Sequence, residues 1–408
     1  MGKKGANAET IQELNRSLIL RELIHNDVCN RAQIAYKTGL TQAAISKIIA
    51  PLVEREIIKE VSFMTGKKGR RSIGICLNSN KFLVIAVKIT RSSYTIGLFD
   101  LKGTMITSKV ESLLNDMILG GARESINRIK KNIRKYLDTF NNIYAIGISI
   151  PGPYLNNEGQ IIFMSGYPGW DEVNLIDEFA SDFSIPVYIE HDANASAIAE
   201  WKFGGYALGE EGVLVHILAS EGIGAGIVVN GEVLEGGHGI AGEIGHMSIN
   251  CDGELCACGN RGCLELYCSA LAIPKRAKAQ LSDWPESKLN KLEYITMNDI
   301  IDGAKLKDAF CSEVIKQTGY YLGCGIANII NIYDPNIVVI SDILTDAGEP
   351  LLNVINETVK KRVLKQIFEK TSIVYSKLKV DSALMGAAAV VIERLLKQPN
   401  LLLDDSKG

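Results

Sequence analysis

The first 78 residues carry apolar side chains with the period of helices and then with that of short strands. In residues 8–26 the apolar positions that share one predicted helix face are Ile11, Leu14, Leu18, Ile19, Leu23 and Ile24. Two further helices are expected, one at residues 31–37 and one from Thr41, a favoured N-cap type, through Leu52, with Gly39 as the break between them. Residues 57–78 then predict two strands around a basic, glycine-containing tip.

From about residue 82 the pattern changes to short apolar strands separated by longer helical stretches. Strands are expected at 82–90, 94–100, 145–151, 186–192, 212–219, 222–234 and 336–341, and helices at 122–140, 174–183, 297–332 and 382–396. This alternation predicts an α/β domain. Because the strand pattern starts twice, near residues 82 and 213, we expect two related lobes. The domains expected are residues 1–78 and 79–408, and a chain of 408 residues is too long for one core.

The composition favours a globular protein with one basic module. Apolar residues make up 47% and charged residues 22% of the chain. We expect no membrane span and no secretory signal, hence a cytoplasmic protein whose nine cysteines are thiols or metal ligands. Residues 1–78 hold 13 Lys+Arg and 7 Asp+Glu, a net +6, so the remainder carries −9 of the total −3. This asymmetry indicates that the first part binds a polyanion.

Three helices with a glycine in the turn between the second and the third are typical of a helix-turn-helix module that binds DNA. Residues of its third helix that could reach bases or phosphates are Thr41, Gln42, Ala43, Ser46 and Lys47, whereas Ile45 and Ile48 would face inward. The basic tip would place Lys67, Lys68, Arg70 and Arg71 along phosphates or in a minor groove. The alternative is a three-helix domain that has a function other than DNA binding and carries a solvated basic loop.

A cluster of metal-ligand types follows near the middle of the chain. His246, Cys256, Cys258 and Cys263 offer one imidazole and three thiolates within 18 residues. Such a set completes a tetrahedral Zn²⁺ shell with no open position for water, as in a structural site. Cys251 and Cys268 are alternative ligands, and a set of buried free thiols is the alternative to a metal site.

Five motifs occur in a specific order, at residues 147–153 (GISIPGP), 190–195 (EHDANA), 222–226 (GIGAG), 242–246 (GEIGH) and 256–265 (CACGNRGCLE). In this combination the chain resembles the ROK family of repressors and sugar kinases over nearly its whole length. The resemblance implies an N-terminal winged helix-turn-helix and a two-lobed α/β domain of the actin and hexokinase (ribonuclease H-like) fold. It also implies that zinc binds His246, Cys256, Cys258 and Cys263.

Family kinases bind sugar, and the resemblance carries their contacts to particular positions. Asp192 would correspond to the general base, and Glu243, His246 and Glu265 would contact sugar hydroxyls. His191 occupies a position where the family often has Asn. The sugar that is recognised can therefore differ from glucose in the arrangement of its hydroxyl groups. Without the resemblance, we would interpret Asp192 as a helix cap and Glu243 and Glu265 as solvated surface charges.

The turns that bind ATP in family kinases are altered at three places. Residues 88–92 read Lys-Ile-Thr-Arg-Ser where the family has Asp-x-Gly-Gly-Thr, and Ser220-Glu221-Gly222 replaces Gly-Thr-Gly. Ser341-Asp342 replaces a late glycine pair. Glu221 would repel phosphate, and a base without a phosphate donor cannot phosphorylate. The resemblance therefore implies a protein that is not an enzyme.

Together these features predict a sugar-responsive repressor of carbohydrate-use genes. It would bind double-stranded operator DNA as a homodimer or a dimer of dimers, with a small sugar as effector. The alternatives are a sugar kinase with an atypical ATP site, a repressor controlled by a protein partner such as a membrane sugar-transporter component, and an activator.

Overall fold

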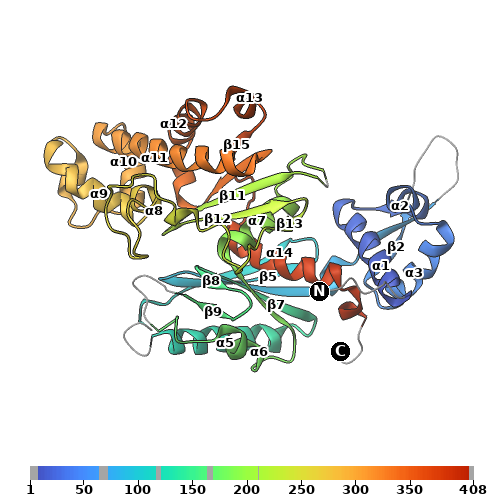
Figure 1. The fold of residues 1–408 in the computed structure, drawn as a ribbon. Helices are drawn as coiled ribbons and strands as arrows, with labels where there is room; N and C mark the ends of the chain where they lie inside the picture. The colour runs from blue at the N-terminus through green and yellow to red at the C-terminus, as the bar shows by residue number, and fades with distance from the viewer. Residues whose placement is uncertain (1–7, 64–71, 116–120, 163–168, 210, 404–408) are drawn as a thin grey trace. The chain divides into compact units, whose positions relative to one another are not determined.

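The computed structural model describes residues 8–63, 72–115, 121–162, 169–209 and 211–403. Its contacts divide the chain into two compact units (Figure 1). Unit 1 comprises Met1–Ile148, Leu175–Ile189 and Ala387–Gly408, and unit 2 comprises Ser149–Asn174 and Glu190–Gly386. The expected DNA-binding residues thus belong to unit 1, together with the first of two five-stranded sheets.

The N-terminal part of unit 1 has the predicted three helices and a small sheet. The helices are α1 (Ala8–His25), α2 (Arg31–Thr38) and α3 (Gln42–Glu54), and β1 (Cys29–Asn30), β2 (Ile58–Phe63) and β3 (Ser72–Leu77) form a sheet in the order β1-β3-β2. Ile19 and Leu23 of α1 are buried as predicted, but Ile11, Leu14 and Leu18 are 50%, 60% and 38% exposed. Only the second half of α1 therefore contributes to this core.

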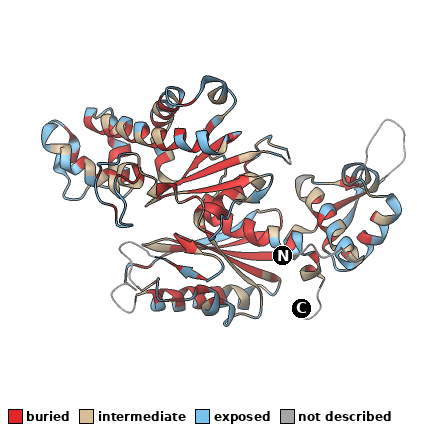
Figure 2. Ribbon diagram, in the orientation of Figure 1, coloured by how far each residue is buried: buried red, intermediate tan, exposed pale blue. Residues whose placement is uncertain are grey.

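The rest of unit 1 is built on a sheet of the order β10-β7-β4-β5-β6. Its strands are β4 (Leu83–Ile89), β5 (Ser93–Asp100), β6 (Met105–Ser112), β7 (Ile143–Ile150) and β10 (Val187–His191), and its helices include α5 (Ala122–Thr139) and α6 (Leu175–Ala180). On α5, Ile126, Ile129 and Ile133 are buried at the spacing of one helix face, opposite charged residues. The central strands are almost wholly buried, as the red strands of Figure 2 show.

Unit 2 repeats this sheet with the same connectivity. Its strands are β11 (Val213–Ala219), β12 (Ile223–Val229), β13 (Glu232–Val233), β14 (Ile337–Ser341) and β15 (Ser372–Tyr375), in the order β13-β12-β11-β14-β15. If each set is numbered along the chain, both sheets read 3-2-1-4-5. In unit 2 the first three strands pair antiparallel, and β14 and β15 add in parallel to β11. The expectation of two related lobes is confirmed.

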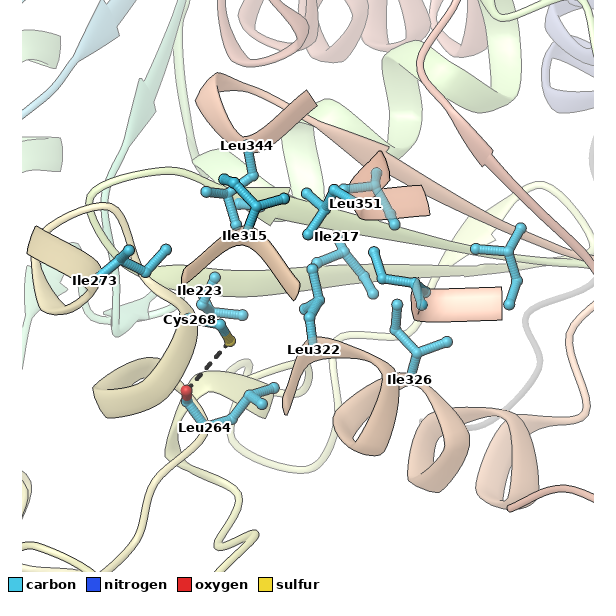
Figure 3. Close-up of a cluster of buried hydrophobic side chains, with 14 of the residues drawn as sticks. Ile217, Ile223, Leu264, Cys268, Ile273, Ile315, Leu322, Ile326, Leu344 and Leu351 are labelled. Atoms are coloured by element: carbon cyan, nitrogen blue, oxygen red, sulfur yellow. Dashed lines mark hydrogen bonds between the residues drawn. The ribbon is translucent and has the colours of Figure 1, made fainter. Parts of the chain in front are cut away.

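The helices of unit 2 enclose a large apolar core. They are α7 (Asp192–Phe203), α8 (Glu265–Cys268), α9 (Ala272–Gln280), α10 (Met297–Lys305), α11 (Ala309–Tyr333), α12 (Glu349–Lys360) and α13 (Lys365–Phe368). Helix α14 (Ser382–Lys397) begins in unit 2 and ends in unit 1, and β8 (Tyr154–Leu155) pairs with β9 (Gln160–Ile161). Figure 3 shows Ile217 and Ile223 of the sheet among Leu322 and Ile326 of α11 and Leu351 of α12. None of the helices within the described ranges is long and apolar enough to cross a membrane.

Several elements were not predicted from the sequence, among them β6, β15, α9 and α12, and one prediction joined two helices. Strand β6 lacks an apolar period and is exposed along most of its length, and β15 has only four residues. Helix α12 does carry a helical apolar period, with Leu351, Ile355 and Val359 buried on one face. The stretch 297–332 is interrupted at Lys307, whose φ is 62°, and the side chain of Asp308 caps the start of α11. Side-chain capping sets the boundary between α10 and α11, and the apolar period of the sequence does not indicate such a cap.

Helix α7 packs against β12 at a distance that only glycine permits. A Cβ at Gly226 would lie 2.3 Å from the backbone oxygen of Ala193, and one at Gly224 would lie 3.1 Å from the Cβ of Ala193. Ala193 and Ala197 are fully buried on the helix side of this contact. The contact fixes the first turn of α7, where Asp192 lies.

We predict that Gly226→Ala lowers the free energy of unfolding by about 1–3 kcal/mol, because the added methyl group overpacks the contact between α7 and β12. Chemical denaturation of the full chain measures this. The matched control is Gly237→Ala, since a Cβ at Gly237 meets no atom within 4 Å. The control should change stability by less than about 1 kcal/mol, and equal effects of the two substitutions would contradict the argument.

Candidate functional site

The predicted DNA-contacting residues of α3 form one exposed face. Thr41 caps the helix, and its Oγ1 accepts a hydrogen bond from the backbone N–H of Ala44 at 3.2 Å. The five predicted contact residues are all exposed, namely Thr41, Gln42, Ala43, Ser46 and Lys47. Ile45 and Ile48 are buried, as predicted. The predicted tip residues Lys67, Lys68, Arg70 and Arg71 lie outside the described residues.

The turn before α3 depends on one glycine. Gly39 ends α2 with φ 70°, and its N–H donates to the carbonyl of Ala35 at 3.0 Å. At the other end of α2, Asn30 and Gln33 form a reciprocal capping box. Both ends of this short helix are therefore fixed by local hydrogen bonds, and the left-handed Gly39 ends α2 three residues before α3 begins.

In unit 2 the predicted sugar-contacting residues begin where β10 meets α7. His191 is the last residue of β10 and is 6% exposed, and Asp192 is the first residue of α7. The Nε2 atom of His191 lies 3.2 Å from Oδ1 of Asp192. The carboxylate also lies in the first turn of a helix, which favours its negative charge.

Gly152 brings a third predicted residue, Glu243, to the same place. A Cβ at Gly152 would lie 2.5 Å from Nε2 of His191 and 3.2 Å from Oε1 of Glu243. The structure therefore brings His191, Asp192 and Glu243 together around the backbone of Gly152. The sequence contained Gly152 within the motif of residues 147–153 but gave no sign of this role.

A second residue that sequence reasoning missed is Glu190, which fixes the segment around His191. Its Oε1 accepts hydrogen bonds from Nδ2 of Asn156 at 3.0 Å, from the backbone N–H of His191 at 3.0 Å and from Nδ2 of Asn194 at 3.2 Å. One carboxylate oxygen thus joins the strand end, the first turn of α7 and a neighbouring loop. The only signal in the sequence was the presence of Glu190 in the motif of residues 190–195.

The four predicted metal ligands converge. The candidate ligand atoms of His246, Cys256, Cys258 and Cys263 all lie within 4.8 Å of one another. The Sγ atoms of Cys258 and Cys263 are 3.7 Å apart, and Sγ of Cys256 is 3.8 Å from Nδ1 of His246. Two ligands at about 2.3 Å from a tetrahedral ion lie about 3.8 Å apart, so the spacing fits a bound metal ion.

The backbone of the cysteine loop is held so that these side chains can meet. The backbone N–H of Cys256 donates to the carbonyl of Asn260 at 2.7 Å, and Nδ2 of Asn260 donates to the carbonyl of His246 at 3.1 Å. Gly262 has φ 63°, and a Cβ there would lie 1.8 Å from the carbonyl oxygen of Asn250. Neither alternative ligand, Cys251 or Cys268, belongs to this cluster. The buried thiol of Cys268 donates instead to the carbonyl of Leu264.

Glu265 lies against the metal cluster. Its Oε1 lies 3.4 Å from Nδ1 of His246 and accepts a hydrogen bond from Sγ of Cys256 at 3.3 Å. Burial raises the pKa of Cys256 to about 12, so a cation is needed to form its thiolate at neutral pH. Because Nδ1 of His246 faces the thiols, Nε2 is the ring nitrogen on the side away from them.

The turn at Ser341-Asp342, one of the three places where the sequence departs from the family's ATP-binding motifs, is held by contacts of its own side chains. Asp342 has φ 73°, a conformation that suits glycine, and its side chain accepts a hydrogen bond from the N–H of Ile343 at 2.7 Å. Ser341 is buried, and its hydroxyl lies 2.8 Å from Nε2 of the fully buried His216. Desolvation lowers the pKa of His216 to about 3, so this imidazole is neutral. Both polar side chains at this turn therefore contact the protein itself.

Comparison with known proteins finds relatives along the whole chain. The model of the ROK family matches residues 84–394. The DNA-binding transcriptional dual regulator NagC of Escherichia coli K12 is 32% identical over 392 residues, which cover 96% of this chain and 95% of NagC. The xylose repressor of Bacillus subtilis 168 is 28% identical over 391 residues, which cover 96% of this chain and 98% of the repressor.

Solved structures agree with the fold. A ROK family transcriptional regulator, described as a homologue of the E. coli MLC protein, matches with a TM-score of 0.81 and 27% identity over 96% of this chain and 98% of that one. A ROK family glucokinase from Streptomyces griseus in complex with glucose and AMPPNP matches with a TM-score of 0.67 and 24% identity. That match covers 76% of this chain and 98% of the glucokinase, and it supports the two-lobed fold of sugar kinases.

We predict that Cys258→Ser removes the bound metal, because it takes away one of four ligands. The loss of affinity should be at least as large as the roughly 10–100-fold loss caused by removing an outer-shell partner. The metal content of the purified full chain and its melting temperature measure the effect. The matched control is Cys251→Ser, an exposed cysteine of the same loop outside the cluster. Unchanged metal content and melting temperature in Cys258→Ser would exclude a metal site here.

Proposed function

The chain belongs to the ROK family, and from this premise we propose that it is a sugar-responsive transcriptional repressor of carbohydrate-use genes. The observation that carries the proposal is the match, over nearly the whole chain, of relatives named as a xylose repressor or as transcriptional regulators, whereas the glucokinase match covers about three quarters of the chain. The family model begins only at residue 84. The repressors therefore share the N-terminal residues that precede the family domain.

Residues 1–78 act as a winged helix-turn-helix that binds operator DNA. The exposed polar face of α3 lies in the major groove, with Thr41, Gln42, Ala43, Ser46 and Lys47 in reach of bases and phosphates. The basic segment between β2 and β3 contacts phosphates or a minor groove through Lys67, Lys68, Arg70 and Arg71. A homodimer, or a dimer of dimers, would place two such helices on the half-sites of a palindrome.

Residues 79–408 bind the sugar effector. The geometry that supports this is the meeting of His191, Asp192 and Glu243 at the backbone of Gly152. Two carboxylates and an imidazole accept and donate hydrogen bonds to vicinal hydroxyls, and Gly152 leaves the space that the His191 ring occupies. His246 and Glu265 complete the set of sugar contacts, next to the metal cluster.

The ion that fits the cluster is zinc in a structural role. Three thiolates and one imidazole form a soft tetrahedral set, which zinc prefers, and the set leaves no position open for water. The ion is held by His246, Cys256, Cys258 and Cys263. By fixing the loop that carries His246 and Glu265, it orders this part of the sugar site.

Kinase chemistry is lost in this chain. Lys88 stands where family kinases have a metal-binding Asp, and the residues that follow it replace two phosphate-binding glycines with side chains. Glu221 places a carboxylate in the second phosphate turn. At the third turn Ser341 is engaged with His216 and Asp342 caps the next turn of chain. Asp192 therefore serves as a sugar contact and not as a base.

For the sugar to act as a switch, it must bind the DNA-free conformation better than the DNA-bound one, since a ligand shifts an equilibrium only by its difference in affinity.

We predict that one sugar or sugar phosphate raises the melting temperature of the purified chain and that ATP does not. A ligand at 100 times its Kd adds about 2.7 kcal/mol of stability. Asp192→Asn should abolish the shift, whereas the exposed control Asp171→Asn should keep it. A shift with ATP would contradict the loss of kinase chemistry. No shift with any sugar would contradict sugar control and favour control by a protein partner.

We predict that Gln42→Ala relaxes sequence preference, with a loss of about 1–3 kcal/mol on the preferred DNA, if Gln42 contacts a base edge. Lys47→Ala should weaken binding to all sequences. It should also lower by about one the number of ions released on DNA binding, which is measured from the slope of log affinity against log salt concentration. The probe is a duplex selected from a random library by the full-length protein. Lys131→Ala, which removes an exposed charge from α5, is the control. Equal affinities of the original chain and of the three variants would exclude α3 as the DNA contact.

A further inference from the structure

Helix α14 runs through both compact units, since its residues 382–386 belong to unit 2 and its residues 387–397 belong to unit 1. Every residue from 382 to 392 is buried. A helix that is buried on all sides is packed at the density of a protein core, so it shifts only together with the elements that it contacts. The elements at its two ends are therefore mechanically connected through it.

In unit 2, α14 packs against α7, the helix that begins with the proposed sugar contact Asp192. A Cβ at Gly386 would lie 2.4 Å from the backbone carbonyl carbon of Ala195, which is about one helical turn after Asp192. At the start of α14 the hydroxyl of Ser382 donates to Oε1 of Glu200 at 3.3 Å, and both residues are buried. The backbones of the two helices touch, so a shift of α7 displaces α14.

In unit 1, the other end of α14 contacts α1 of the DNA-binding module, residues 1–78. The guanidinium of Arg21 on α1 forms an ion pair with Glu393 of α14. One turn of α1 earlier, Nη1 of Arg16 donates to Oδ1 of Asn400 at 2.6 Å. Asn400 lies in the short helix η6 (Pro399–Leu402), which directly follows α14. Two side chains of α1 are thus held by the end of the chain that α14 carries.

Other ion pairs between the DNA-binding module and the rest of unit 1 are more exposed. Nζ of Lys102 lies 2.8 Å from Oδ1 of Asp27, and Nζ of Lys81 lies 2.6 Å from Oε2 of Glu56. The side chains of Asp27 and Glu56 are 96% and 63% exposed, whereas that of Glu393 is 13% exposed. Water and salt screen the exposed pairs, so the contact at Glu393 holds the module more strongly than they do.

We propose that α14 couples the effector site to the DNA-binding module, with Glu393 and Asn400 as the residues that position α1. The inference rests on the proposed function and adds a route to it. A sugar bound at Asp192 shifts α7, α7 shifts α14 at Gly386, and α14 shifts α1. A ligand changes the affinity for DNA only when both sites favour different arrangements of a shared element, and α14 is that element.

The experiment is a double-mutant cycle on the DNA affinity of the full-length protein without sugar. Gly386→Ala adds a methyl group where α14 meets α7 and so displaces α14. Under the proposed function the sugar-free chain is the form that binds DNA. Gly386→Ala should therefore raise the dissociation constant for the duplex selected from the random library at least fivefold.

The same substitution is then made in two further backgrounds. In the first, Glu393→Gln and Asn400→Ala release α1 from α14, and Gly386→Ala should now raise the dissociation constant less than twofold. In the second, Asp27→Asn breaks an ion pair of the module that does not involve α14, and the fivefold effect should remain. This difference separates transmission through α14 from a merely structural role of the charged pairs.

The control for general destabilisation is Gly303→Ala, since a Cβ there would lie 2.4 Å from Sγ of Cys311, between α10 and α11. It should leave the dissociation constant within twofold. Circular dichroism checks that each variant is folded. If Gly386→Ala does not fold, Ser382→Ala takes its place, because it removes the hydrogen bond from α14 to Glu200. Its effect should be at least twofold in the original chain and absent when α1 is released.

Three results would each overturn the inference: unchanged DNA affinity in the folded α14 variant, a full effect after α1 is released, or an equal effect of Gly303→Ala. The proposed function is tested on the original chain alone, by its DNA binding and its sugar-induced thermal shift. An original chain that passes both tests while the cycle shows no coupling keeps the proposed function and loses only the route through α14.

Discussion

The contact between α7 and β12 leaves no room for a side chain at Gly226, and the candidate effector site depends on that contact. Because the helix backbone lies almost against the strand, the first turn of α7 has one allowed position. That turn carries Asp192 and follows directly on His191. The carboxylate of Glu190 then fixes the junction by hydrogen bonds to the backbone N–H of His191 and to Asn194. Close packing and one shared acceptor, the carboxylate of Glu190, together position the residues proposed to bind a sugar.

The cysteine loop is the second constraint on the same site. Its turns are closed by backbone hydrogen bonds and by a glycine at which no side chain fits, so three thiols and one imidazole face one point. Glu265 contacts two members of this cluster. A cation bound there would therefore affect the orientation of a carboxylate proposed to bind sugar, which couples metal content to effector response in one small region of unit 2.

The turn at Ser341-Asp342, where the sequence departs from the family's ATP-binding motif, uses its polar side chains within the protein. Asp342 retains a glycine-like φ, yet its side chain caps the chain that follows, and Ser341 is used by a buried neutral histidine. The strain at Asp342 is offset by a hydrogen bond that glycine could not make. The polar atoms of both side chains are thus used in hydrogen bonds within the protein.

The sequence by itself determined the order of most of the larger helices and strands, the doubled lobe, the exposed face of α3 and the cluster of candidate metal ligands. These follow from apolar periods, caps and ligand spacing, which are local properties of the chain. It did not indicate β6, because an edge strand exposed on most of its length has no apolar period to detect. The roles of Gly152, Gly226 and Glu190 were also hidden, since each depends on atoms brought close by folding from distant segments. Tertiary structure alone decided these contacts, because steric exclusion and shared acceptors act through space and leave no periodic trace along the chain.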